Sequence, residues 1–124
     1  MSHKLLVVDD EPFIVETFMR YFQRQGYTVT GLGSAEEAIS LVEKEKFDLI
    51  FLDNILPGMS GMRAIQELAR RSNARVLMMT GHFDQELKKD ALLMGAVDFL
   101  PKPLEFDRLE CRVRELLGNA KSRG

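Results

Sequence analysis

The chain has 124 residues, of which 45% are hydrophobic and 29% are charged, a composition typical of an ordinary globular domain. With 17 lysines and arginines against 19 aspartates and glutamates, the net charge of -2 gives no general attraction to nucleic acid or to an anionic membrane. The single cysteine cannot form an internal disulfide, and no apolar run approaches the roughly 18 residues needed to span a bilayer. We therefore expect a cytoplasmic domain with its own core and no membrane or direct nucleic-acid contact.

The chain begins with a short strand followed by an amphipathic helix. Residues 4–8 form an apolar run rich in β-formers, and this run stops at three acidic residues, 9–11. Pro12 suits the first position of a helix, and apolar residues then recur at four-residue spacing until Gly26 provides a left-handed stop. Residues 27–32 predict a second strand, which is more polar than the first and so suits the edge of a sheet.

A second helix and a buried strand follow. Ser34 and Glu37 form a capping box, which predicts a helix start. Residues 49–52 are an unbroken apolar run, which is typical of a strand buried on both faces inside a parallel sheet. Asp53 comes next, at the carboxyl end of the strand, where open α/β sheets place their ligands. Because the proline and glycine signals at 57–61 then turn the chain away, we expect Asp53 at a rim rather than in the core.

The second half of the chain repeats the alternation. The expected elements are a helix from residue 60, a strand at 75–79, a helix capped by Asp84, a strand at 97–100 and a last helix that frays by Gly118. Five strands alternating with helices favour a parallel sheet with right-handed crossovers and helices on both faces. No second domain is visible, so we expect one domain over 3–118, followed by a frayed tail or the start of a linker at 119–124.

Four of the five predicted strands end at a side chain able to do ionic or phosphate chemistry. These side chains are Asp9 and Asp10 after the first strand, Asp53 after the third, Thr80 after the fourth and Lys102 after the fifth. Because the carboxyl ends of parallel strands share one edge, they should converge in space. Close carboxylates repel one another unless a cation lies among them, and an all-oxygen site suits Mg²⁺, for which Mn²⁺ could substitute. Asp53 is then the candidate nucleophile toward phosphorus, forming an aspartyl phosphate.

Four short motifs lie in order along almost the whole chain. They are Val-Val-Asp-Asp-Glu at 7–11, Leu-Asp-Asn-Ile-Leu-Pro-Gly-Met-Ser-Gly at 52–61, Met-Thr-Gly at 79–81 and Gly-Ala-Val-Asp-Phe-Leu-Pro-Lys-Pro at 95–103. Each motif is weak alone, but together they resemble the receiver domain of two-component response regulators, in the CheY-like superfamily. The resemblance implies a doubly wound, flavodoxin-like (βα)5 fold with strand order 2-1-3-4-5.

The resemblance also implies a phosphorylation site with a metal. Asp53 would accept a phosphoryl group from a sensor histidine kinase or a phosphotransfer protein, as in a phosphorelay. Asp10, Asp53 and the main-chain carbonyl of Ile55 would bind Mg²⁺ directly, and Asp9 would assist partly through water. The implied activity is that of a regulatory phosphoacceptor that assists its own phosphorylation and dephosphorylation, not that of a turnover enzyme.

Further residues take roles from the same resemblance. Thr80 and Lys102 would hold the phosphoryl oxygens. Phe99 falls where the family has its switch aromatic, which swings inward as Thr80 moves toward the phosphate. The family also implies a cis peptide before Pro103, and X-Pro is the usual place for one.

An output surface is implied over the fourth helix, the fifth strand and the fifth helix, because Phe99 lies within it. Asp98 and Arg112 fit the pattern by which winged-helix-type regulators pair across a dimer. Lys88 also fits, but Arg108 stands where its acidic partner is expected. Two interpretations stay open: a homodimer on activation, and a surface that contacts an output domain or a partner protein.

Three rival functions belong to other classes. A receiver-like docking module that works without phosphorylation would keep the fold, yet every phosphorylation residue is present. A flavodoxin-like cofactor binder would need glycines, serines or threonines after the first strand, where this chain has acids. A phosphatase with an aspartyl nucleophile would normally carry its nucleophile and its acid–base carboxylate close together after one strand. The phosphorylated switch is therefore the leading interpretation.

Overall fold

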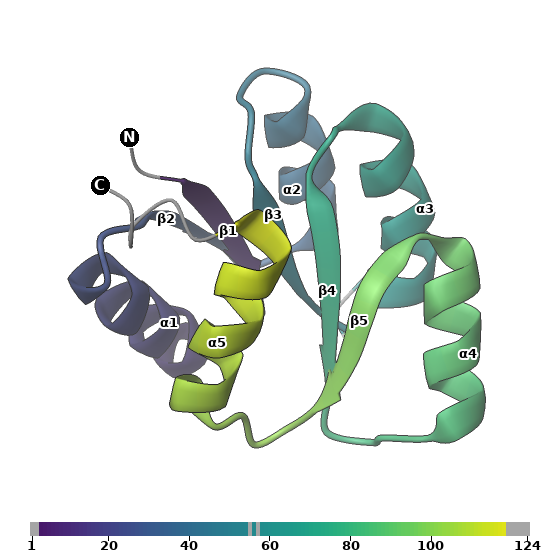
Figure 1. Cartoon of the computed structure of the whole chain (residues 1–124). Coiled ribbons are helices and arrows are strands. Elements are labelled where there is room, and N and C mark those ends of the chain that lie inside the picture. Colours follow the sequence, from purple (N-terminus) through teal and green to yellow (C-terminus); the bar gives the residue numbers. More distant parts are fainter. Residues whose placement is uncertain (1–2, 55, 57, 119–124) are drawn as a thin grey trace.

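Strands and helices alternate along the chain (Figure 1). The computed structural model describes residues 3–54, 56 and 58–118. The strands are β1 (Lys4–Val8), β2 (Thr28–Leu32), β3 (Leu49–Asp53), β4 (Arg75–Thr80) and β5 (Ala96–Pro101). The helices are α1 (Pro12–Arg24), α2 (Ala35–Val42), α3 (Gly61–Arg71), α4 (Gln85–Met94) and α5 (Phe106–Leu117).

The strands pair in the order β2-β1-β3-β4-β5, and all four pairings are parallel. The predicted fold class, strand order and edge position of β2 are therefore confirmed. Helices α1 and α5 cover one face of the sheet, and α2, α3 and α4 cover the other (Figure 1). Because all the pairings are parallel, the carboxyl ends of the strands lie at one edge of the sheet.

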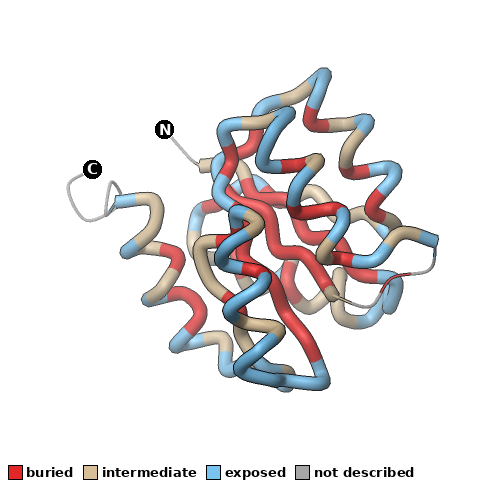
Figure 2. Tube along the Cα trace, turned by 90° about the vertical axis from the view of Figure 1, so that its right-hand side faces the viewer, coloured by how far each residue is buried: buried red, intermediate tan, exposed pale blue. Residues whose placement is uncertain are grey.

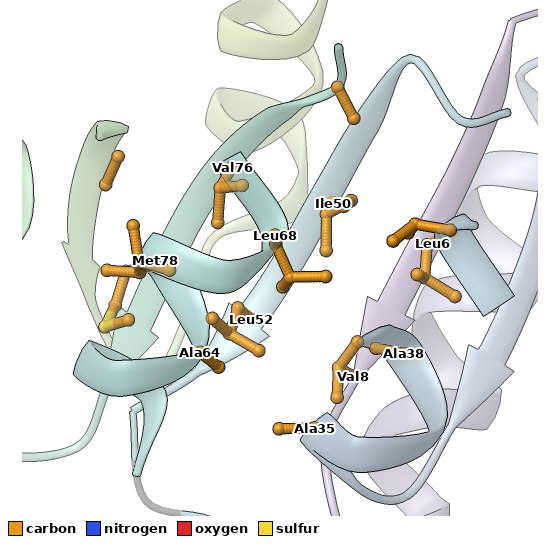
Figure 3. Packing of buried hydrophobic residues seen from close by; sticks show 14 of the residues in the cluster. Leu6, Val8, Ala35, Ala38, Ile50, Leu52, Ala64, Leu68, Val76 and Met78 are labelled. Carbon is orange, nitrogen blue, oxygen red and sulfur yellow. The ribbon is translucent and has the colours of Figure 1, made fainter. Parts of the chain in front are cut away.

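Successive residues of the central strands point to opposite faces of the sheet, as the two-residue period of a strand requires. Leu6, Ile50 and Val76 pack toward α2, α3 and α4, in the layer that Figure 3 shows from close by. Phe51 and Leu77 pack toward α1 and α5. Because both faces are covered, every residue of β3 is buried, and Figure 2 shows the central strands as the most continuously buried part of the chain.

Aromatic side chains fill the space between the sheet, α1 and the start of α5. The ring centroid of Phe18 lies 4.9 Å from that of Phe51 and 5.1 Å from that of Phe106. Phe22 stacks on Phe51 with a centroid separation of 5.4 Å. Rings at these separations attract one another beyond the effect of burial, so they hold α1 and the start of α5 against the sheet.

Some strand ends and one helix cap differ from the sequence predictions. The strand expected at 97–100 runs from Ala96 to Pro101, because its pairing with β4 extends to Thr80. The capping box is formed only in part. Ser34 Oγ accepts the Glu37 N–H at 3.2 Å as expected, but the Glu37 carboxylate accepts from the Ser34 hydroxyl at 3.3 Å rather than reaching back to the backbone.

Among the helices of the described part of the chain, none combines the length and the apolar character needed to span a membrane.

Candidate functional site at the carboxyl edge of the sheet

Three carboxylates meet where β1 and β3 end. Asp9 and Asp10 follow β1, Asp53 is the last residue of β3, and one oxygen from each of the three lies within 4.8 Å of the others. Asp9 is 1% exposed, whereas Asp10 is open to solvent. The side chains come together because β1 and β3 are adjacent parallel strands. Val8, at the end of β1, pairs with Leu52, so both strands end at the same edge of the sheet.

Asp53 is more enclosed than the sequence suggested. It was expected at a rim and not in the core, and it does lie at the strand end, but only 6% of its surface is exposed. The pairing of β3 with β4 continues past it, since the Asn54 N–H donates to the Met79 carbonyl at 2.8 Å. Buried carboxylates need charged or hydrogen-bonding partners, and a partner reaches this site from β5.

That partner is Lys102, which follows β5. Its Nζ atom lies 2.9 Å from Oδ2 of Asp9 and 3.4 Å from Oδ2 of Asp53. Burial alone would lower the pKa of this ammonium group, but the hydrogen bond to Asp9 and the negative charges of Asp53 and Asp9 outweigh it, so the Lys102 pKa is raised above its ordinary value. Lys102 therefore stays cationic and links the two buried acids.

Thr80 and Lys102 are joined through the backbone. The Lys102 N–H donates to the Thr80 carbonyl at 2.7 Å, beyond the last residue pair of β4 and β5. Thr80 is fully buried, and its hydroxyl oxygen accepts the N–H of His82 at 3.0 Å. The peptide bond between Lys102 and Pro103 is cis, the isomer that the resemblance implies. Thr80 thus ends its strand at the same edge as the three acids.

The residues at this edge fit a hard divalent cation. Three carboxylates with oxygens this close to one another form an all-oxygen donor set, which suits Mg²⁺ and similar ions. The main-chain carbonyl of Ile55, expected as a further ligand, lies outside the described residues. An ammonium group beside such a cluster adds a second positive charge that can face an anionic ligand. The arrangement is therefore suited to binding a phosphoryl group together with a metal ion.

Phe99 is buried between the sheet and its helices, away from solvent. Its side chain is 0% exposed and belongs to the core layer between the sheet and α2, α3 and α4. Phe83, in the loop between β4 and α4, places its ring centroid 5.6 Å from that of Phe99. Sequence reasoning missed Phe83, because an aromatic residue in a loop has no periodic pattern to mark it. Only its position three residues after Thr80 could have pointed to the site.

The residues expected at a dimer or output surface make contacts within this chain. Arg112 Nε donates to Asp98 Oδ2 at 2.9 Å, and this hydrogen bond raises the Arg112 pKa above its ordinary value. The other oxygen, Asp98 Oδ1, accepts the Phe99 N–H at 2.8 Å. Lys88 lies over the ring of Phe83, with 6.0 Å between its Nζ atom and the ring centroid. Asp98 and Arg112 therefore join β5 to α5, and Lys88 joins α4 to the loop that precedes it.

Curated proteins related to this chain are regulators. The TorCAD operon transcriptional regulatory protein TorR of Escherichia coli (strain K12) is 35% identical over 117 residues, which are 94% of this chain and 51% of that protein. The Regulatory protein VanR of Enterococcus faecium is 35% identical over 121 residues, which are 98% of this chain and 52% of that protein. The chain spans about half the length of these curated relatives.

Solved structures agree with the fold. A two-component response regulator from Clostridium difficile superposes with a TM-score of 0.91 at 26% identity, over 94% of this chain and 96% of that one. A response regulator protein from Burkholderia pseudomallei, solved with a phosphorylated aspartic acid, a calcium ion and citrate, gives a TM-score of 0.84 at 31% identity, over 98% of this chain and 70% of that one. Residues 5–114 match the response regulator receiver domain family. The five-stranded sheet and the clustered acids agree with this match. The chain belongs to the response regulator receiver domains of two-component signal transduction.

Proposed function

We propose that this receiver domain is a switch controlled by phosphorylation of Asp53 in a reaction that depends on Mg²⁺. The observation that carries the proposal is the meeting of Asp9, Asp10, Asp53 and Lys102 at one edge of the sheet. Asp53 is the acceptor because it ends the central strand, while Asp9 and Asp10 are adjacent on the neighbouring one. The phosphorylated aspartic acid named for the Burkholderia pseudomallei relative supports this assignment.

The same acids would hold the metal. Asp10 and Asp53 are proposed as direct ligands of Mg²⁺, with Mn²⁺ as a substitute, the Ile55 carbonyl as a further ligand and Asp9 assisting partly through water. When bound, the ion would offset the negative charge of the carboxylates and of the phosphoryl oxygens. The structure of the Burkholderia pseudomallei relative is named as containing a calcium ion, which supports the binding of a divalent cation.

The chain's own residues would assist the transfer. A carboxylate oxygen of Asp53 attacks phosphorus, and the bond from phosphorus to the donor's imidazole nitrogen breaks, with its electron pair going to the imidazole. The Lys102 ammonium, already 3.4 Å from Asp53, would turn from Asp9 to a phosphoryl oxygen. The Thr80 hydroxyl accepts the His82 N–H and still has its own proton to donate to a second phosphoryl oxygen.

Phosphorylation of Asp53 would change the surface formed by α4, β5 and α5. Thr80 and Phe99 are proposed to move together when Asp53 is phosphorylated, with Phe99 holding or regaining its inward position. Because the Phe99 N–H is bonded to Asp98, which pairs with Arg112 on α5, a shift of β5 at Phe99 would reach the surface of α5. Lys88, Asp98 and Arg112 would then contact an output domain, a partner protein or a second copy of the chain.

The input would be a sensor histidine kinase or a phosphotransfer protein. We propose residues 3–118 as the receiver domain and 119–124, which lie outside the described residues, as a tail or the start of a linker. The curated relatives are longer than this chain, and several are named as regulators of transcription, which supports an output region controlled by this domain.

Phosphorylation can be tested with acetyl phosphate and Mg²⁺, followed by intact-protein mass spectrometry. One added phosphoryl group is expected on the wild type, and none on Asp53→Asn or after removal of divalent metal with EDTA. Asp48→Asn is the matched control, because Asp48 precedes the opposite end of β3, and it should be phosphorylated like the wild type. An unmodified wild type would favour a docking module that works without phosphorylation. An equally modified Asp53→Asn variant would place the acceptor elsewhere.

A further inference from the structure

A loop aromatic contacts the buried ring of Phe99. The Phe83 side chain is 38% exposed, and its ring meets that of Phe99 at a centroid distance of 5.6 Å and an interplanar angle of 45°. Tilted pairs at this separation are attractive, because the positive edge of one ring faces the negative face of the other. Phe99 itself is 0% exposed, so the pair joins a buried ring to one that reaches solvent.

The same loop is tied to Thr80 at one end and to α4 at the other. The N–H of His82, the residue before Phe83, donates to the Thr80 hydroxyl oxygen at 3.0 Å. On the other side, the Lys88 ammonium lies 6.0 Å from the centroid of the Phe83 ring, at the outer limit of a cation–π contact. One short segment therefore joins the hydroxyl at the candidate site, the buried aromatic ring and α4.

We propose that Phe83 is a positioning residue that acts through Phe99. Its ring holds Phe99 in the inward position, and the contact with Lys88 carries that position to α4. For Phe99 to turn outward, it would have to lose its contact with Phe83, so the pair favours the inward ring. The link to phosphorylation rests on the proposed function of Asp53, whereas the hold of Phe83 on Phe99 does not.

The first measurement needs no phosphoryl group. Aromatic NMR spectra of the unmodified protein, with the Phe99 signals assigned by a Phe99→Tyr substitution, would report the environment of the ring. In Phe83→Ala the loss of the Phe83 ring current by itself moves the Phe99 signals. These signals should in addition broaden, because Phe99 loses this contact and samples an outward position. Phe83→Tyr keeps a ring at this position and should restore the wild-type signals.

The second measurement connects the ring pair to the site, with beryllofluoride and Mg²⁺ as the probe of the phosphorylated state. Phe83→Ala should weaken beryllofluoride binding about threefold to tenfold, which is the range expected for one aromatic pair. The backbone shift of Lys88 on beryllofluoride binding should also shrink. Leu93→Ala is the matched control, since it removes another exposed apolar side chain, 78% exposed, from α4 and should leave both readouts unchanged.

The possible outcomes separate the two proposals. Phe99 signals in Phe83→Ala that stay as sharp as in the wild type would overturn the inference, even if Asp53 is phosphorylated normally. Altered Phe99 signals with unchanged beryllofluoride affinity would overturn the link from Phe83 to the site. A wild type that binds no beryllofluoride would count against the proposed function, and the spectra of the unmodified protein would still decide whether Phe83 holds Phe99. Thermal unfolding of each variant would show that the differences do not come from loss of the fold.

Discussion

The ammonium nitrogen of Lys102 lies 2.9 Å from a carboxylate oxygen of Asp9, although the two residues are 93 positions apart in the chain. The Asp9 side chain is 0% exposed, and that of Lys102 is 21% exposed. A carboxylate so far from water depends on its partner, because the cost of leaving a buried charge unpaired exceeds the net gain from pairing it. The Lys102 side chain should therefore matter for stability as well as for phosphoryl binding.

Replacing Lys102 by methionine should lower the free energy of unfolding by about 1–3 kcal/mol in the absence of divalent metal. The reason is that Asp9 and Asp53 would remain buried without a cation. Millimolar Mg²⁺ should reduce this loss, because the metal would occupy the same acidic cluster. Urea unfolding with and without Mg²⁺ measures both effects, with Lys89→Met, which removes an exposed lysine of α4, as the control. Equal stability of Lys102→Met and wild type would show that the ion pair makes no net contribution.

The raised pKa of Lys102 predicts a loss of stability in alkali. Burial opposes the charged form, but the hydrogen bond to Asp9 and the charges of Asp53 and Asp9 raise the folded-state pKa above the ordinary value of 10.5. A group whose pKa is higher in the folded state than in the unfolded state stabilises the fold fully at pH values below its unfolded-state pKa. This stabilisation is lost as the pH rises through the folded-state pKa. The difference in unfolding free energy between wild type and Lys102→Met should therefore be constant up to about pH 10 and shrink above it.

Two tyrosines also change the stability of the protein in alkali. The effect of Lys102 is therefore measured as the difference in stability between wild type and Lys102→Met. Burial raises the pKa of both Tyr21 and Tyr27, so they also withdraw stability as the pH rises above about 10. Because both proteins keep these tyrosines, their effect cancels in the difference between the two urea-unfolding series. A difference that instead grew with pH would contradict the raised Lys102 pKa.

Gly61 should be required where α3 begins beside Asp53. A β-carbon at this position would lie 2.7 Å from the Cα of Asn54 and 2.8 Å from the carbonyl oxygen of Asp53. Both are backbone atoms that cannot turn away, so Gly61→Ala must shift the chain at the acceptor. We expect an overpacking loss of about 1–3 kcal/mol in stability, together with slower phosphorylation by acetyl phosphate. The control is Gly33→Ala, where no atom of the described residues, apart from Gly33 and its two chain neighbours, lies within 4 Å of the added carbon. Equal phosphorylation of both variants would exclude the effect.

Gly31 should be required for the approach of α1 to β2. A β-carbon there would overlap Cγ1 of Val15 and lie 3.2 Å from Sδ of Met19. Valine is stiff in a helix, so Gly31→Ala should destabilise the fold by about 1–3 kcal/mol. Adding Val15→Ala makes room for the new methyl group, so the double variant should lose less stability than the sum of the single ones. Additive losses in urea unfolding would show that the two side chains do not compete for space.

The alternation of elements and the approximate position of the site could be predicted from local sequence. The apolar run at Leu49–Leu52 has the pattern of a strand covered on both faces, and β3 is buried throughout. Asp9, Asp53 and Lys102 each follow or end a strand, and parallel strands bring their carboxyl ends to one edge. Local periodicity and the common direction of the strands were thus enough to predict which side chains would share that edge.

Tertiary structure alone decided how those side chains pair. The shorter Lys102 contact is with Asp9 and not with Asp53, and the oxygens of Asp98 are divided between Arg112 and the Phe99 backbone within one chain. The enclosure of Asp53 likewise depends on neighbouring strands. Periodicity reports which face of its own element a residue occupies, whereas distances between elements depend on sheet register and helix packing. Those are set by the whole core at once, so no local pattern in the sequence specifies them.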